Sequence, residues 1–325
     1  MLKLLNKLSK NSKNTESDKI IETLYDSVHE LIKIIKSNDN NTIKIINNLI
    51  HQSLLDYVHV SLKGIDEIDA LKDKKDDRDF KVLISNTKLK IKLFILNCLT
   101  FYHESLLDSK ESYLSLDFEF NQRQIAVMQL CFESPISKVK WIWLTNPAEF
   151  SKEENKIYIE LIMANKNIHK ILHGADSLDI PFLFHTYFED NKDIAKQFMK
   201  KYIDTRFLCE YFKQSIDDGK KCAIYDALEY FKVINKKQFD NLNNTHDGMG
   251  PVQDISWSIH TLDKYSTKYA YYDVLFLKTF IQKIFTCAKQ KTPDKYSFYI
   301  YIPVITRYVI LEKRGIKKIK VYLNL

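Results

Sequence analysis

Glycine and proline are scarce in this sequence, with 6 of each among its 325 residues. This scarcity excludes collagen-like repeats and linker arrays, and it disfavours an all-β protein, which needs many tight turns. Cysteine is also rare, and the 5 cysteines are odd in number, dispersed and without a C-x-x-C pair. We therefore expect neither a disulfide framework nor a zinc site, and we expect a reducing intracellular compartment, the cytoplasm or the nucleus.

Long apolar runs and a strong charge bias are absent too. No apolar stretch is long enough to cross a bilayer, so we expect no membrane segment. The opening residues, MLKLLNKLSKNSKN, lack the apolar core of a secretory signal, but they also lack acids, which leaves a mitochondrial presequence open. The formal net charge of +7 is a mild excess that is compatible with a polyanionic partner without requiring one.

Hydrophobic residues, by contrast, make up 45% of the chain and aromatic residues 13%, which can fill a sizeable core. The sequence predicts a helical N-terminal region over 1–110. It does not reveal whether these helices bind another protein. Two helices with apolar side chains at helical spacing are separated by a polar break, and the second runs from Thr42 to Leu62. A further helix is predicted over Ile91–Leu107, capped near Asn86 or Thr87.

The pattern of apolar and polar residues changes after this region. Three apolar, β-branched or aromatic runs with short polar breaks predict an antiparallel meander, with strands at 112–120, 124–132 and 139–144. A crossover helix over 151–166 then leads to a short strand, KILH, at 170–173. Because a crossover helix joins parallel strands, the sheet is predicted to be mixed, in an α/β fold.

The rest of the chain predicts more elements of both kinds. A strand and three helices are expected at 202–205, 206–212, 222–232 and 266–287. The glycine-rich HDGMGP, residues 246–251, is predicted to be a connecting loop. Residues 291–325 are too apolar to hang free, so we expect a C-terminal extension that packs onto a central domain formed by 111–290.

The strand SYLSLDFEF places two acids, Asp117 and Glu119, among apolar and aromatic residues. Carboxylates are rarely buried unless they are paired or bind a metal. Alternate residues of a strand share one face, so both acids point into the same space from a rigid support. Two carboxylates placed in this way form half of a site for a hard cation.

Further acids follow downstream. Asp179 comes just after the strand-to-helix turn in KILHGADSLD, where α/β sheets place their sites, and Asp176 in the same turn is the alternative to it. Either residue could instead only cap the helix. Tyr269 and Asp273 in TKYAYYDVLFL are four positions apart, so they share one face of the predicted helix.

In this order the motifs resemble those of the DEDD superfamily of 3′–5′ exonucleases, in its tyrosine-bearing branch, and above all the RNase D-like exoribonucleases. The resemblance covers about 112–287. One departure lies in the second motif, where Leu178 occupies the spacing at which the family usually has its acid, although the IPFL after Asp179 matches the family. The supporting residues outside the acid motifs are Gln129, Asp204, Thr205 and Trp257.

The resemblance implies a ribonuclease H-like fold, a mixed sheet with helices on both sides, and a catalytic site with two Mg²⁺ or Mn²⁺ ions. In this scheme Tyr269 orients or helps to deprotonate the attacking water, and His173 either contacts the substrate or holds the HGA turn. The partner is single-stranded nucleic acid, with RNA favoured; a DNA exonuclease and a catalytically silent nucleic-acid-binding scaffold are the alternatives. The implied metal ligands are Asp117, Glu119, Asp179 and Asp273.

Overall fold

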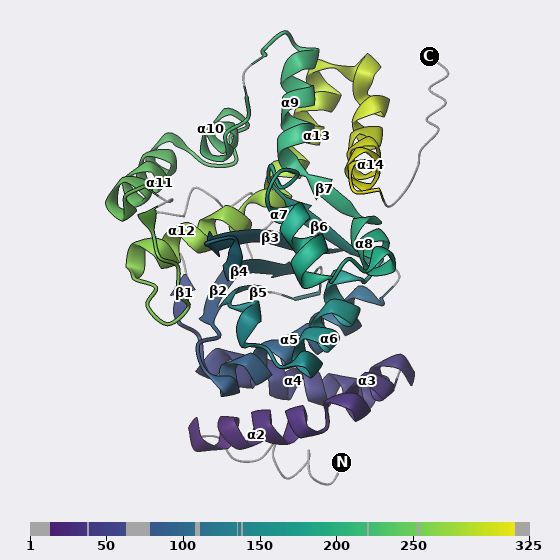
Figure 1. The fold of residues 1–325 in the computed structure, drawn as a ribbon, viewed down its shortest axis with the longest axis vertical. Helices are drawn as coiled ribbons and strands as arrows, with labels where there is room; N and C mark the ends of the chain where they lie inside the picture. Colours follow the sequence, from purple (N-terminus) through teal and green to yellow (C-terminus); the bar gives the residue numbers. More distant parts are fainter. Residues whose placement is uncertain are drawn as a thin grey trace.

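Figure 1 shows the computed structural model of the chain, which describes residues 14–37, 39–62, 79–107, 111–134, 136–137, 139–219, 221–251 and 254–315. A seven-stranded mixed sheet forms its centre, in the order β1-β2-β5-β4-β3-β6-β7. The strands are β1 (Val60–Leu62), β2 (Asp79–Ile84), β3 (Ser112–Asn121), β4 (Gln124–Glu133), β5 (Val139–Thr145), β6 (Ile168–Leu172) and β7 (Tyr202–Asp204).

β3, β4 and β5 form the antiparallel meander predicted from the sequence, and β6 and β7 extend the sheet in parallel beside β3. The crossover from β5 to β6 runs through α6 (Lys152–Tyr158), which continues as a π-helical turn to Met163. A capping box between Ser151 and Glu154 fixes where this crossover helix begins. The predicted mixed α/β sheet is therefore confirmed.

Helices cover both faces of the sheet, and each face has its own hydrophobic core (Figure 1). Leu116 and Phe118 of β3 belong to the first core, so the alternate positions that hold the acids face the second. Besides α6, the first core contains α2 (Asn14–Asp26), α3 (Val28–Ser37), α4 (Asn40–Asp56), α5 (Lys88–Ser105), α7 (Asp179–Phe182) and α8 (Lys192–Met199). The second contains α9 (Thr205–Ser215), α10 (Ile224–Tyr230), α11 (Lys236–Met249), α12 (Lys264–Leu275) and α13 (Leu277–Lys291).

The N-terminal region is not entirely helical, which corrects one prediction. α4 ends at Asp56 rather than near Leu62, and the chain then forms β1, which pairs antiparallel with β2. β2 pairs in parallel with β5, and its Val82 and Leu83 are fully buried in the two opposite cores. A strand buried on both faces lacks the polar alternation by which strands are recognised in a sequence.

The core also crosses the predicted boundary at residue 110. α5 begins after the predicted cap Thr87, and the ring of Phe94 stacks on Phe132 of β4 with centroids 6.2 Å apart. A division of the chain at 110 and 290 therefore stays a prediction. The first 13 residues lie outside the described part of the chain, so the mitochondrial presequence also stays a prediction.

Helix α11 replaces most of the loop predicted at 246–251. It runs to Met249 and ends at Gly250, whose φ of 79° is a conformation that glycine adopts without strain. Few of its side chains are apolar, which is why helical periodicity did not reveal it. The helix predicted over 266–287 is present as α12 and α13, which meet at Phe276.

The C-terminal helix α14 (Tyr296–Lys313) packs against α9, α13 and β7. Its Tyr299 and Leu311 are buried, one in each core. Arg307 donates from Nε to the carbonyl oxygen of Tyr202 in β7 at 2.6 Å, which ties the helix to the edge of the sheet. Neither α14 nor any other described helix is long and apolar enough to cross a bilayer.

Cys209 in α9 and Cys222 before α10 are joined by a disulfide, which was not expected from the sequence. Their Cα atoms lie 6.2 Å apart, although 13 positions separate them along the chain. The pairing depends on how α9 and the following loop fold together, and dispersed cysteines do not reveal this. The reducing compartment stays a prediction.

Removal of this disulfide should destabilise the protein, because the bond closes a loop. We expect the double variant Cys209→Ala/Cys222→Ala to lose about 3 kcal/mol of unfolding free energy, measured by chemical denaturation. Dithiothreitol should lower the stability of the wild type by a similar amount and leave the double variant unchanged. Cys287→Ala, which removes a free cysteine, is the control. Equal stability of the oxidised and reduced wild type would contradict the expectation.

Candidate metal centre

The two acids of β3 lie toward the end of that strand, on the face that packs against α12. Asp117 is opposite Gln129 of β4, and Gln129 Nε2 donates to Glu119 Oε1 at 3.0 Å. The register of the two strands shifts between Glu119 and Phe120, a β-bulge of the kind that re-aims side chains beside active sites. The β3–β4 pair thus holds both acids on one rigid support.

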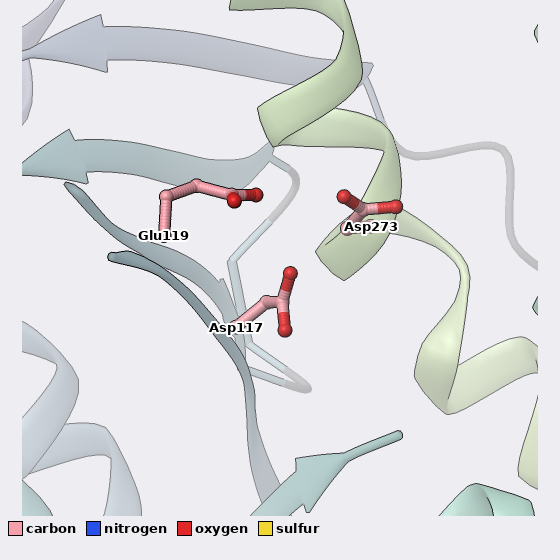
Figure 2. A group of neighbouring side chains, drawn as sticks. All are labelled: Asp117, Glu119 and Asp273. Atoms are coloured by element: carbon pink, nitrogen blue, oxygen red, sulfur yellow. The ribbon is translucent and has the colours of Figure 1, made fainter. Parts of the chain in front are cut away.

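Helix α12 brings a third carboxylate to the same place. Asp273 is buried, and one carboxylate oxygen from each of Asp117, Glu119 and Asp273 lies within 4.8 Å of the others (Figure 2). We call these three residues the acid cluster. A capping box between Asp263 and Ser266 fixes the start of α12 and hence the side from which Asp273 projects.

Asp179 begins α7 and lies beside the acid cluster rather than within it. Burial, followed by the charge of Asp117, raises the pKa of Asp179 to about 8, which places this carboxylate within electrostatic reach of the cluster. The alternative, Asp176, instead forms an ion pair with Arg206, with Oδ1 and Nη2 3.6 Å apart. Of the two acids, Asp179 is therefore the better candidate for a fourth ligand.

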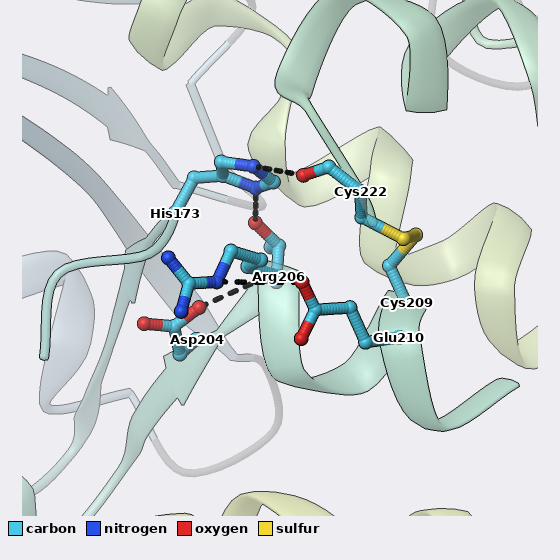
Figure 3. The surroundings of a disulfide bond; sticks show 7 residues. His173, Asp204, Arg206, Cys209, Glu210 and Cys222 are labelled. Atoms are coloured by element: carbon cyan, nitrogen blue, oxygen red, sulfur yellow. Dashed lines mark hydrogen bonds and ion pairs between the residues drawn. A yellow bond between two sulfur atoms is a disulfide. The ribbon is translucent and has the colours of Figure 1, made fainter. Parts of the chain in front are cut away.

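A buried acid, Asp204, holds the turn from which Asp179 extends. Its carboxylate accepts hydrogen bonds from the backbone N–H of Gly174 at 2.9 Å and of Ala175 at 3.0 Å. Gly174 has a φ of +70°, and a Cβ there would lie 3.1 Å from Nη1 of Arg206, whose side chain Figure 3 shows beside Asp204. The turn therefore needs glycine, and Asp204 fixes the direction in which α7 starts.

His173 lies in the same turn, and the protein occupies both of its ring nitrogens (Figure 3). Nε2 donates to the carbonyl oxygen of Cys222 at 2.9 Å, and Nδ1 lies 2.8 Å from the Thr205 hydroxyl, which also lies 3.1 Å from the carbonyl oxygen of Leu172. Burial lowers the pKa of His173 to about 4, so the ring is neutral at physiological pH. The geometry supports the structural alternative for His173, and neither nitrogen remains for a substrate contact.

Tyr269 lies one turn before Asp273 on α12. The charge of Asp273 and burial raise the pKa of Tyr269 far above its ordinary value, so the phenol stays protonated. Its ring packs against Trp257, with centroids 6.0 Å apart. The backbone of Trp257 is tied to Asn121 of β3 by two hydrogen bonds, of 2.6 and 2.9 Å. This clamp joins the end of β3 to the segment before α12 and fixes Tyr269 relative to the acids.

No lysine or arginine among the described residues offsets the ionised form of the acid cluster, so its pKa values are raised. Burial raises the pKa of Asp117 to about 7, and burial and the charge of Asp117 raise the pKa of Glu119 to about 8. Burial and both neighbouring carboxylates raise the pKa of Asp273 well above its usual range. Their hydrogen-bonding partners, Gln129, Tyr225 and Tyr269, are neutral.

Another buried acid of the same sheet, Glu133, has cationic partners. Glu133 is fully buried at the end of β4, where its Oε2 lies 3.4 Å from Lys140 Nζ and 3.3 Å from Lys278 Nζ. At Glu133 the chain thus supplies lysines as the counter-charge. In the part of the chain that the structure describes, no lysine or arginine forms such an ion pair with the acid cluster.

The donor set of the cluster fits a hard divalent cation. Oδ2 of Asp273 is buried and has no hydrogen-bond partner among the described residues, so it is an acceptor that lacks a donor. Carboxylate oxygens are the ligands that Mg²⁺ and Mn²⁺ prefer, and no cysteine or histidine belongs to the cluster, as a zinc site would favour.

Two residues at the site were missed from the sequence. The hydroxyl of Tyr225 in α10 donates to Asp273 Oδ1 at 3.0 Å, but no motif sets this residue apart among the 19 tyrosines of the chain. Asn121 follows the D-x-E strand, and only its pairing with the distant Trp257 reveals what it does. Both contacts join segments that are far apart in the sequence.

Comparison with known proteins gives a partial match. No family model matches the chain. The uncharacterized protein L533 of Acanthamoeba polyphaga mimivirus is 37% identical over 233 residues, which cover 67% of this chain and 46% of that protein. The chain therefore spans about half the length of the curated relative it matches.

Several solved structures are similar to the chain over 66% to 75% of its length. The Trypanosoma brucei RNase D–GMP complex is 15% identical, covers 75% of this chain and 67% of its own, and gives a TM-score of 0.47. The Nibbler EXO domain of Aedes aegypti is 13% identical, with coverages of 71% and 94% and a TM-score of 0.43. Brucella melitensis NrnC with bound Mg²⁺ is 13% identical, with coverages of 66% and 90% and a TM-score of 0.37.

The strand order and the position of the acids decide the fold. The sheet is mixed, helices cover both faces, and the D-x-E and Y-x-x-x-D motifs lie on β3 and α12. The chain has the predicted ribonuclease H-like arrangement, a mixed sheet with helices on both sides. The fold that the resemblance implied is thus confirmed, whereas the roles of the acids remain predictions.

The raised pKa values make the stability of the metal-free protein pH-dependent. Because these carboxyl groups hold protons more tightly in the folded state, stability should fall as pH rises from about 4 to about 8. Asp117→Asn removes one charge, so its gain in melting temperature over the wild type should grow across this window. Scanning fluorimetry in EDTA measures it, with the exposed Asp226→Asn as control. A gain that shrinks toward pH 8 would contradict the prediction.

Proposed function

We propose that this chain is a metal-dependent 3′–5′ exonuclease that hydrolyses phosphodiester bonds at the 3′ end of single-stranded nucleic acid, with RNA favoured over DNA. The observation that carries the proposal is the acid cluster, whose ligand oxygens lie within 4.8 Å of one another. The order of the acid motifs along the chain resembles that of the RNase D-like exoribonucleases and supports the direction and the preference for RNA.

The acid cluster would hold divalent ions, Mg²⁺ or Mn²⁺, and Asp179 would complete the set. When bound, two such ions supply an activated water and neutralise charge on the leaving oxygen of a phosphodiester. The chain itself contributes the placement of the ligands, which come from β3, α12 and the turn that Asp204 holds. A cation would also relieve the repulsion among these closely spaced carboxylates.

Tyr269 has a positioning role in this proposal rather than that of a base. Its raised pKa keeps the phenol protonated, so it can donate a hydrogen bond but cannot take a proton at neutral pH. Packing against Trp257 holds the ring one turn from Asp273. A donor held there can orient the attacking water or a phosphate oxygen.

Substitution of single acids tests the site. Asp117→Ala and Asp179→Asn should each slow mononucleotide release from a 3′-labelled RNA strand by more than about 100-fold, because loss of a group that merely supports a metal ligand already costs about 10–100-fold. Asp176→Asn, in the same turn, should stay within about threefold of the wild type, since Asp176 pairs with Arg206. If Asp176→Asn slowed the reaction more than Asp179→Asn, Asp176 would be the fourth ligand in place of Asp179. Unaffected rates in all three variants would refute the site.

End-labelled strands test the direction and the substrate. With Mg²⁺ or Mn²⁺, a 3′-labelled RNA should release labelled mononucleotide from the start, while a 5′-labelled copy should shorten progressively. The DNA strand of the same sequence should be degraded more slowly, because only RNA offers 2′-hydroxyls for recognition. Faster loss of DNA would indicate a DNA exonuclease. No cleavage of either strand by metal-loaded protein would indicate the silent scaffold.

A further inference from the structure

We propose that Tyr225 is a positioning residue of the metal site, whose hydroxyl fixes the Asp273 carboxylate so that Oδ2 is the oxygen offered to a divalent ion. This inference rests on the proposed function and deepens it. Tyr225 belongs to neither the D-x-E strand nor the Y-x-x-x-D helix, because it comes from α10.

The two oxygens of Asp273 have different surroundings. Oδ1 accepts a hydrogen bond from the Tyr225 hydroxyl at 3.0 Å, whereas Oδ2 is buried and has no donor among the described residues. The terminal torsion of an aspartate turns broadly when nothing holds it. The Tyr225 hydrogen bond removes that freedom and occupies one oxygen, which leaves Asp273 prepared to bind through the other.

Tyr225 reaches Asp273 from a support that is itself anchored. It is the second residue of α10, and Cys222 just before that helix is joined by its disulfide to Cys209 in α9 (Figure 3). The carbonyl oxygen of Cys222 accepts the hydrogen bond from His173 Nε2, at the end of β6. The start of α10 is therefore tied both to α9 and to the turn after β6.

This origin distinguishes Tyr225 from Tyr269. Tyr269 and Asp273 lie on the same helix, so a contact between them cannot fix α12 relative to the rest of the fold. The Tyr225–Asp273 hydrogen bond joins α10 to α12 across the second core. Loss of the hydroxyl should therefore loosen one metal ligand while the remaining acids stay in place.

Tyr225→Phe removes the hydroxyl and keeps the ring. We expect the full chain with this substitution to bind Mn²⁺ at least about 10-fold more weakly in isothermal titration calorimetry, because loss of such a supporting partner costs about 10–100-fold in metal affinity. Tyr230→Phe, at the exposed end of the same helix, is the matched control and should bind Mn²⁺ as the wild type does. Melting curves without metal check that both variants fold.

Two further measurements separate positioning from a general weakening of the fold. If Tyr225 acts through Asp273, adding Tyr225→Phe to Asp273→Asn weakens Mn²⁺ binding no further, whereas additive losses would overturn the inference. In the nuclease assay, Tyr225→Phe should lower kcat at limiting Mn²⁺ and recover at high Mn²⁺, with the KM for the RNA strand unchanged. A loss of kcat that high Mn²⁺ does not restore would also contradict the role proposed for Tyr225.

The failure of this inference and that of the proposed function look different. Equal or tighter Mn²⁺ binding by Tyr225→Phe, with an active wild type, overturns the role of Tyr225 and leaves the nuclease proposal standing. A folded wild-type chain that binds no Mn²⁺ and degrades no strand overturns the proposed function, and the role of Tyr225 with it.

Discussion

Repulsion between closely spaced carboxylates is the constraint on which the arrangement of this site depends. The fold brings Asp117, Glu119 and Asp273 together, and it surrounds them with neutral donors such as Gln129 and Tyr225. Neutral hydrogen bonds ease the burial of a carboxylate but leave its charge in place. Glu133, another buried acid of the same sheet, instead lies beside two lysines.

Backbone-directed hydrogen bonds hold the elements that bear the acids. Asp204 accepts hydrogen bonds from N–H groups of the HGA turn, and Asn121 binds both the N–H and the carbonyl oxygen of Trp257. Both contacts link segments that are distant in sequence, and both involve groups whose geometry is defined by a planar amide or carboxylate. A site that concentrates like charges requires such supports, because repulsion otherwise favours separation of the elements.

The sequence predicted features that local patterns encode, and it missed those that depend on tertiary contact. The strand that bears Asp117, the meander and the helix that bears Asp273 follow from alternation, helical spacing and motif order. β2 was not predicted because both of its faces are buried, and α11 was not predicted because it has few apolar side chains. The Cys209–Cys222 bond and the contact of Tyr225 with Asp273 arise only when α9, α10 and α12 are assembled.

The central claim is that the acid cluster is an incomplete cation site. Anomalous diffraction from crystals of the chain soaked in Mn²⁺ tests it most directly, because the signal locates the metal independently of any activity. The account predicts a peak bounded by carboxylate oxygens of Asp117, Glu119 and Asp273, with Asp273 contributing Oδ2. The claim would be contradicted if these carboxylates were well ordered in crystals soaked at a high Mn²⁺ concentration and no anomalous peak lay between them.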